Sequence, residues 1–168
     1  TISTSAPCSS SFSDVTITVT NGPQMTSAAT AQICSGDTLS IQLSSDIPAT
    51  FNWSAVNNPN TIGESLSNQQ TSVIRDIITS ASINTETVVY TVTPQSGTCS
   101  GNPQNISVTI NPTPSYSGVA NGSICSGNQL NISLSANIPS TFAWNATDNP
   151  TVTGESLSPQ SGAVLDDA

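Results

Sequence analysis

The sequence of 168 residues has almost no basic side chains, since it holds one arginine, Arg75, and neither lysine nor histidine. Without histidine, Ser-His-Asp and Cys-His catalysis and histidine metal sites are excluded. Without lysine, Schiff-base catalysis is excluded as well. The formal net charge of −9 opposes binding to nucleic acid, which is recognised through basic side chains. We therefore expect neither an enzyme nor a nucleic-acid-binding protein, and no cofactor.

Charge of either sign is scarce, because Asp, Glu, Lys and Arg together make up only 7% of the residues. No apolar run approaches the roughly 20 residues of a membrane-spanning helix, so no membrane insertion is expected. Abundant Val, Ile and Thr with little charge indicate short strands with neutral polar outer faces rather than disorder. No signal peptide is present, so we expect a segment of a longer exported protein whose targeting signals lie elsewhere.

The chain repeats itself without a gap at an offset of 91 residues (125 − 34 = 91). The motif Ile-Cys-Ser-Gly at residues 33–36 returns at residues 124–127, and Gly-Glu-Ser-Leu-Ser at 63–67 returns at 154–158. In the other direction, Cys99 maps onto Cys8. Self-similarity at a fixed offset is the signature of tandem repeats.

This offset predicts three parts of the chain. Residues 1–22 are expected to be the C-terminal strands of a preceding repeat, residues 23–112 a complete repeat, and residues 113–168 the N-terminal part of a following repeat. Prolines at position 23 and in the run 111–114 mark the joints, where they stiffen the linker. A repeat of about 90 residues can bury its own core, so we expect beads on a string.

Apolar residues alternate with polar ones along the complete repeat, which predicts strands with one buried face. The expected inward rows are Leu39, Ile41 and Leu43; Phe51, Trp53 and Ala55; Val88, Tyr90 and Val92; and Ile106, Val108 and Ile110. Residues 72–78 are expected to form a less regular strand. The fold class predicted is all-β, with immunoglobulin-like β-sandwich repeats whose aromatic residues lie in the core.

The order of the motifs adds a resemblance to this reading. The complete repeat runs from Ile-Cys-Ser-Gly through Phe-x-Trp, Val-Tyr-Thr-Val-Thr-Pro and Cys-Ser-Gly-Asn-Pro to Ile-Ser-Val-Thr-Ile-Asn-Pro. This pattern resembles the PKD-like and immunoglobulin-like repeats of large Bacteroidota cell-surface proteins, gliding adhesins among them. The resemblance implies a PKD-like fold, type IX secretion to the cell surface, and a role in a stalk or adhesin. It brings no catalytic residues.

Four cysteines allow three pairings. The economical choice is a disulfide between Cys34 and Cys99 inside the complete repeat, with Cys8 and Cys125 pairing outside the fragment or with neighbouring repeats. In simple immunoglobulin topology these two positions lie at opposite ends of the sandwich, which opposes the choice. The alternative is Cys8–Cys34 with Cys99–Cys125. Zinc is disfavoured, because CxxC spacing and histidine are both missing.

The remaining polar motifs are short. Asp37-Thr38-Leu39 resembles the O-glycosylation motif of Bacteroidota and makes Thr38 a possible modification site. Asp46 and Asn137 occupy equivalent positions of successive repeats, and this exchange suits a turn or capping role that needs no charge. No dense acidic cluster predicts a calcium site. Expected partners are neighbouring repeats and surface glycans or proteins. The alternatives are a carbohydrate- or protein-binding module, or accessory repeats of a secreted enzyme.

Overall fold

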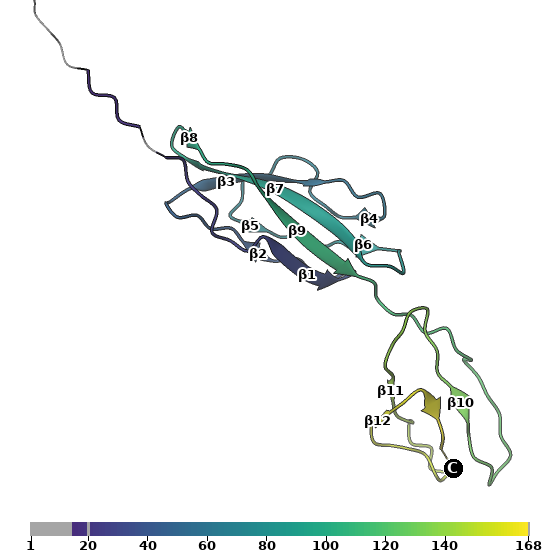
Figure 1. Cartoon of the computed structure of the whole chain (residues 1–168). Coiled ribbons are helices and arrows are strands. Elements are labelled where there is room, and N and C mark those ends of the chain that lie inside the picture. The colour runs from purple at the N-terminus through teal and green to yellow at the C-terminus, as the bar shows by residue number, and fades with distance from the viewer. Residues whose placement is uncertain (1–14, 20, 168) are drawn as a thin grey trace, which may run out of the picture.

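The computed structural model describes residues 15–19 and 21–167. Two bodies follow one another along the chain, the first built from the predicted complete repeat and the second from residues after the 111–114 run (Figure 1). All thirteen elements among the described residues are strands. None of those residues forms a helix long and apolar enough to cross a membrane.

The main sheet of the complete repeat has the strand order β1-β9-β7-β3. These strands are β1 (Thr30–Cys34), β9 (Gln104–Asn111), β7 (Glu86–Ser96) and β3 (Thr50–Val56), and the short β8 (Cys99–Ser100) folds back on the end of β7. β7 is antiparallel to β3 and β9, whereas β1 runs parallel to β9 with Thr30 opposite Ser107. The first and last strands of the repeat are therefore neighbours that run in the same direction.

A second layer covers one face of this sheet with short ladders. β2 (Ile41–Gln42) pairs with β5 (Val73–Ile74), and β4 (Thr61–Ile62) pairs with β6 (Thr79–Ser80). Isolated bridges extend the layer, among them Met25 to Ser45 and Thr38 to Ile77. The two layers enclose the core as in a β-sandwich (Figure 1), and the predicted all-β sandwich fold is confirmed.

The core confirms all four predicted inward rows. Every one of their twelve side chains belongs to the buried cluster, which also holds Ile74 and Ile78. The inward side chains of β7 and β9 are 0% exposed. The polar residues that alternate with them along each strand are exposed or half-buried. Because all buried members lie between Leu39 and Ile110, one repeat completes its own core.

Residues 72–78 form the short strand β5 and an isolated bridge at Ile77 rather than one strand, and the alternation of their side chains is regular. Ile74, Asp76 and Ile78 are buried, while Arg75 and Ile77 are exposed. An aspartate at an inward position hid this alternation in the sequence, because hydrophobicity patterns treat a carboxylate as a surface residue.

The second body repeats, at the 91-residue offset, the β2–β5 ladder and the Trp53–Gln69 bridge of the first. Its ladders join β10 (Ile132–Ser133) to β13 (Val164–Leu165) and β11 (Ala143–Trp144) to β12 (Gln160–Ser161). The same backbone bond recurs as well, from Leu39 N to Asp76 O at 2.8 Å and from Leu130 N to Asp167 O at 2.7 Å. The positions equivalent to β7 and β9 would begin at 86 + 91 = 177, past residue 168.

Candidate functional site

The most connected polar group of the repeat is the buried carboxylate of Asp76, which is 7% exposed. The Tyr90 hydroxyl donates to Asp76 Oδ2 at 2.8 Å. The backbone N–H of Ser65 donates to the same oxygen at 2.8 Å, and the Ser65 hydroxyl donates to Oδ1 at 2.8 Å. Three donors satisfy the carboxylate, as a buried charge requires. The network ties the 63–67 loop and the β5–β6 segment of the second layer to β7 of the main sheet.

Tyr90 and Trp53 fix the centre of the sandwich. Their rings meet edge to face, with centroids 5.8 Å apart, and Trp53 Nε1 donates to Thr71 O at 3.1 Å. Burial of the Tyr90 side chain raises the pKa of its hydroxyl above the ordinary value, and the hydrogen bond to Asp76 adds to this effect. Both aromatics are core residues, as predicted, and neither forms a carbohydrate-stacking platform.

The Asp76 arrangement recurs in the following body, which identifies it as part of the repeat's design. The Ser156 backbone N–H donates to Asp167 Oδ2 at 3.2 Å, and its hydroxyl donates to Oδ1 at 2.5 Å. Residues 65 and 76 map onto 156 and 167 by the 91-residue offset. The sequence pattern alone does not predict this network. The signals that could have found it are the retention of serine and aspartate at both places and the alternation around Asp76.

Asp76 does not offer a catalytic pair with Glu64, the nearest acidic residue before it in the sequence. The Asp76 oxygens are already occupied by three donors, and Glu64 Oε1 accepts a hydrogen bond from the Thr61 hydroxyl. General acid–base work on a glycoside requires carboxylates that reach the substrate. The buried network therefore serves the fold.

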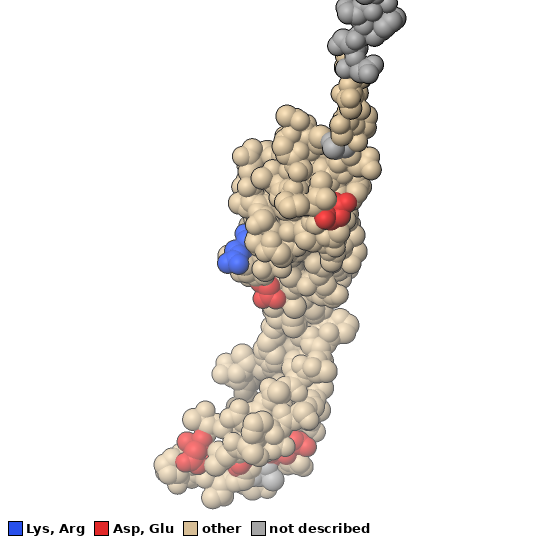
Figure 2. Space-filling view, turned by 90° about the vertical axis from the view of Figure 1, so that its left-hand side faces the viewer, with Lys and Arg blue, Asp and Glu red and all other residues tan. Residues whose placement is uncertain are grey.

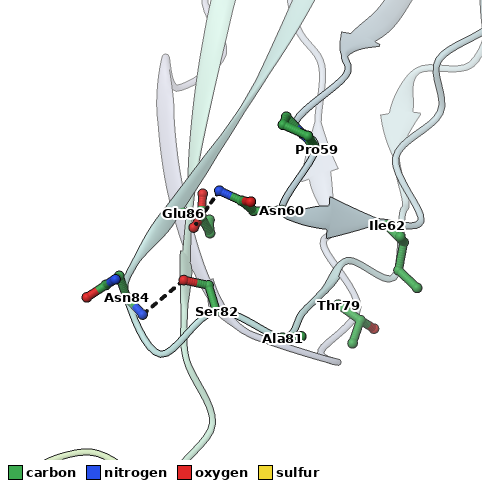
Figure 3. Close-up of a pocket in the computed structure, with 8 residues that line it drawn as sticks. All are labelled: Pro59, Asn60, Ile62, Thr79, Ala81, Ser82, Asn84 and Glu86. Atoms are coloured by element: carbon green, nitrogen blue, oxygen red, sulfur yellow. Dashed lines mark hydrogen bonds between the residues drawn. The ribbon is translucent and has the colours of Figure 1, made fainter.

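A hollow of about 600 Å³ lies beside the start of β7 and the β4–β6 ladder (Figure 3). Its lining is Pro59, Asn60, Ile62, Thr79, Ala81, Ser82, Asn84 and Glu86. Glu86 is the one carboxylate of this lining, and it accepts from Asn58 Nδ2 at 3.2 Å and from Asn60 Nδ2 at 3.1 Å. Hydrogen bonds from Asn58, then Asn60, then Ser82 hold the pKa of Glu86 below its ordinary value. The lining mixes polar and apolar side chains and carries no aromatic ring.

The sheet register does not bring Cys34 and Cys99 together, which corrects the predicted pairing within one repeat. Cys34 ends β1 opposite Asn111, and Cys99 pairs with Ser96 at the other end of β7. The ten residue-to-residue steps from Glu86 to Ser96 span about 33 Å at about 3.3 Å per step. A disulfide bridges Cα atoms only about 4.4–6.8 Å apart.

Of the alternative pairing, the Cys99–Cys125 bond does not fit this arrangement either. Cys125 occupies the turn equivalent to that of Cys34, since Asn128 N donates to Cys125 O as Asp37 N donates to Cys34 O. Cys99 therefore faces the opposite end of the first repeat from the joint that leads to Cys125. Cys8 lies outside the described residues.

The predicted capping role of the Asp46/Asn137 exchange is confirmed. Asp46 Oδ1 accepts from Gln24 N at 2.7 Å, and Asn137 Oδ1 accepts from Ser115 N at 2.8 Å. A carboxylate and an amide oxygen thus fix the same entry segment in successive repeats. Among the described residues no group of three or more acidic or cysteine side chains is placed to hold a metal ion.

The surface carries few charged side chains. Figure 2 shows one basic side chain and a few acidic ones on a face that is otherwise uncharged. Thr38 lies on this surface with its side chain exposed, although its backbone bridges Ile77. Its position leaves the hydroxyl accessible, and O-glycosylation of Thr38 remains a prediction.

Two packed sheets, a parallel pairing of the first and last strands, and a buried Trp–Tyr pair define an immunoglobulin-like all-β sandwich. The sequence pattern of the PKD-like domain matches residues 31–114 and, a second time, residues 122–168. The chain therefore belongs to the PKD-like domain family, and its tandem repetition is confirmed. None of the curated proteins compared with the chain matches it. PKD-like domains are generally non-catalytic structural modules, and they typically occur in extracellular or surface proteins.

Proposed function

We propose that the chain is a segment of an extended stalk on a bacterial cell surface, which displays an adhesin through tandem PKD-like repeats. The repeats would be residues 23–112, flanked by parts of two others at 1–22 and 113–168. Gliding-type surface adhesins exported by the type IX route are the setting that the motif resemblance supports. Neighbouring repeats are the first partners, and surface glycans or proteins are the targets of adhesion.

The observation that carries this proposal is the parallel pairing of β1 with β9. The chain enters the repeat at Pro23, which lies against Gly101 beside the Ser96 end of β7, and it leaves after Asn111, beside the Glu86 end of β7. Repeats joined in this way add their lengths. Each repeat contributes at least the length of the eleven-residue β7, about 36 Å at about 3.3 Å per residue.

The same pairing suits a stalk under tension. Five residue pairs join β1 to β9 from Thr30–Ser107 to Cys34–Asn111. Pulling on the two ends of the repeat slides β1 along β9, so the ladder bonds between them are loaded together in shear rather than opened one after another. Forced unfolding is governed by the rate of unfolding, so a ladder broken as a unit slows it.

The test measures length and strength on tandem copies of the complete repeat. Small-angle X-ray scattering on one, two and three copies is expected to show the maximum dimension rising by about 36 Å or more per copy. A rise well below one sheet length per copy would mean that repeats fold back on one another, and the stalk would be ruled out.

Single-molecule pulling then compares two proline variants of β1. Backbone bonds from Ser107 N to Ala29 O and from Ser35 N to Asn111 O set the odd-numbered residues of β1 toward β9. Ala31→Pro removes a donor that faces β9, and it is expected to lower the unfolding force. Gln32→Pro removes a donor that faces away, and it should leave the force closer to that of the unchanged repeat. Equal forces for all three would refute the role of this ladder.

A further inference from the structure

The two cysteines of a repeat lie at its two opposite joints. Cys34 is followed by Ser35, whose carbonyl accepts a hydrogen bond from the Thr113 hydroxyl at 3.0 Å, and Ser35 N donates to Asn111 O at 2.8 Å. The Cys34 turn is therefore fastened to the segment that leads into the next repeat. The Cys34 side chain is exposed beside it.

Cys99 occupies the equivalent place at the other joint. A Cβ atom at Gly22 would lie 2.3 Å from Ser100 O, and one at Gly101 would lie 1.8 Å from Pro23 O, so the hairpin after Cys99 packs directly on the segment that enters the repeat. Gly101 N also donates to Pro94 O at 2.9 Å, which holds the hairpin against the end of β7.

The 91-residue offset relates the contacts at the two joints to the same linker residue. Gly22 maps onto Thr113 (22 + 91 = 113), the residue that contacts Ser35. By the same offset, the counterpart of the Cys99 hairpin in the next repeat would pack on the segment that begins at Thr113, the residue whose hydroxyl binds the Cys34 turn. A Cβ at Gly22 would lie 2.3 Å from Ser100 O, so the Cβ of Thr113 would require the backbone of the counterpart hairpin to shift away from it.

We propose that successive repeats are cross-linked at each joint by a disulfide between the Ile-Cys-Ser-Gly cysteine of one repeat and the late cysteine of the next. For Cys34 the partner would be position 190 (99 + 91), and for Cys99 it would be a cysteine of the preceding repeat. No two of the four cysteines in these 168 residues are then partners of each other. This inference rests on the tandem arrangement of the proposed stalk and not on its adhesive role.

The cross-link forms by oxidation. Each of the two thiols gives up one proton and one electron, a single S–S bond forms, and an external disulfide such as oxidised glutathione accepts both electrons and both protons to become two thiols. An oxidising extracellular setting favours this product. Each bond would restrict bending at a joint that otherwise consists of a few residues.

The test uses two copies of residues 23–113 joined directly, which keeps Thr113 before proline at the joint as in the natural chain. Each copy contains the whole buried cluster and can fold by itself. The tandem is oxidised with a glutathione redox couple, denatured and alkylated with iodoacetamide, and its intact mass gives the number of reactive thiols. Of four cysteines, two are expected to be alkylated, in a monomer.

Four serine variants identify the bonded pair. Cys34→Ser in the first copy or Cys99→Ser in the second copy should raise the alkylated count to three. Cys34→Ser in the second copy or Cys99→Ser in the first, which are the matched controls, should lower it to one. The inference is overturned if all four thiols react, if the two sets of variants exchange their results, or if the bond forms only between molecules. Scattering of the reduced tandem reports on the stalk separately.

Discussion

Replacing Tyr90 by phenylalanine tests whether the buried Asp76 network stabilises the repeat. The substitution keeps the ring that packs edge to face on Trp53 and removes only the hydroxyl that donates to Asp76 Oδ2 at 2.8 Å. The carboxylate keeps its two bonds from Ser65, so no charge is left without partners. The experiment therefore isolates one hydrogen bond to a buried charged group.

The expected loss follows from the type of bond. A hydrogen bond to a charged group contributes about 1.5–3 kcal/mol to the free energy of unfolding, and burial places this one toward the upper part of that range. For a domain of this size each kcal/mol lowers the melting temperature by about 4–8 °C, so a fall of roughly 10 °C or more is expected. The urea m-value should not change, because the surface exposed on unfolding stays the same.

Urea unfolding of residues 23–113, followed by tryptophan fluorescence, measures this loss. The matched control is Thr91→Val on the same strand, which removes a hydroxyl bonded to Asn105 Oδ1 at 3.1 Å on the exposed face. The control should change the free energy of unfolding by no more than about 0.5 kcal/mol. If Tyr90→Phe is as stable as the control or more so, the desolvation of the carboxylate outweighs its bonds, and the reasoning fails.

Three further predictions concern pH, backbone geometry and the hydrogen bond that Asp46 accepts. Burial raises the pKa of the Tyr90 hydroxyl in the folded state, so Tyr90 contributes its full stabilisation below the pKa of the unfolded state, about 10. As the pH rises above this pKa, the free energy of unfolding should decline. Thermal melts at alkaline pH should show this decline in the unchanged repeat and not in Tyr90→Phe. Gly63→Ala should lower the free energy of unfolding in urea by more than about 3 kcal/mol, because φ is +101° and the new Cβ would lie 2.0 Å from a carbonyl oxygen. Gly36→Ala is the control: φ is +92° but the space around the new Cβ is open, so the cost should be about 1–2 kcal/mol. Asp46→Asn should leave the melting temperature unchanged, as Asn137 accepts the equivalent bond, while Asp46→Ala should cost about 1 kcal/mol.

The sequence predicts the buried rows of the sandwich well, because alternation is a local property of each strand. Trp53 and Tyr90 each stand in an uninterrupted row of apolar residues, and the structure buries both. The role of the turn residues could also be predicted. The exchange of Asp46 for Asn137 shows that this turn needs a hydrogen-bond acceptor and not a charge. Internal repetition thus supplied information that composition did not.

What the sequence did not reveal depends on contacts between distant segments. Asp76 could not be placed in the core, since its hydrogen-bond donors come from residues 65 and 90 and only the fold brings them together. The position of β1 beside β9 was also not readable, because a parallel pairing leaves no turn to mark its register. The Cys34–Cys99 bridge is wrong for the reason that the immunoglobulin topology gives, because the two cysteines lie at opposite ends of the sandwich.

The parallel closure of β1 on β9 also has a consequence for how the chain folds. The paired ends, Cys34 and Asn111, are 77 residues apart in the sequence (111 − 34), so this contact forms late and at a large cost in chain entropy. The following repeat offers an equivalent of β1 at residues 121–125, only ten residues after β9 ends (121 − 111). Pairing β9 with this second candidate would exchange strands between neighbours, but the nine residues 112–120 are fewer than the dozen or more that a parallel crossover needs. The competitor carries Gly122 where β1 has Ala31, which weakens it as a strand and favours closure within the repeat.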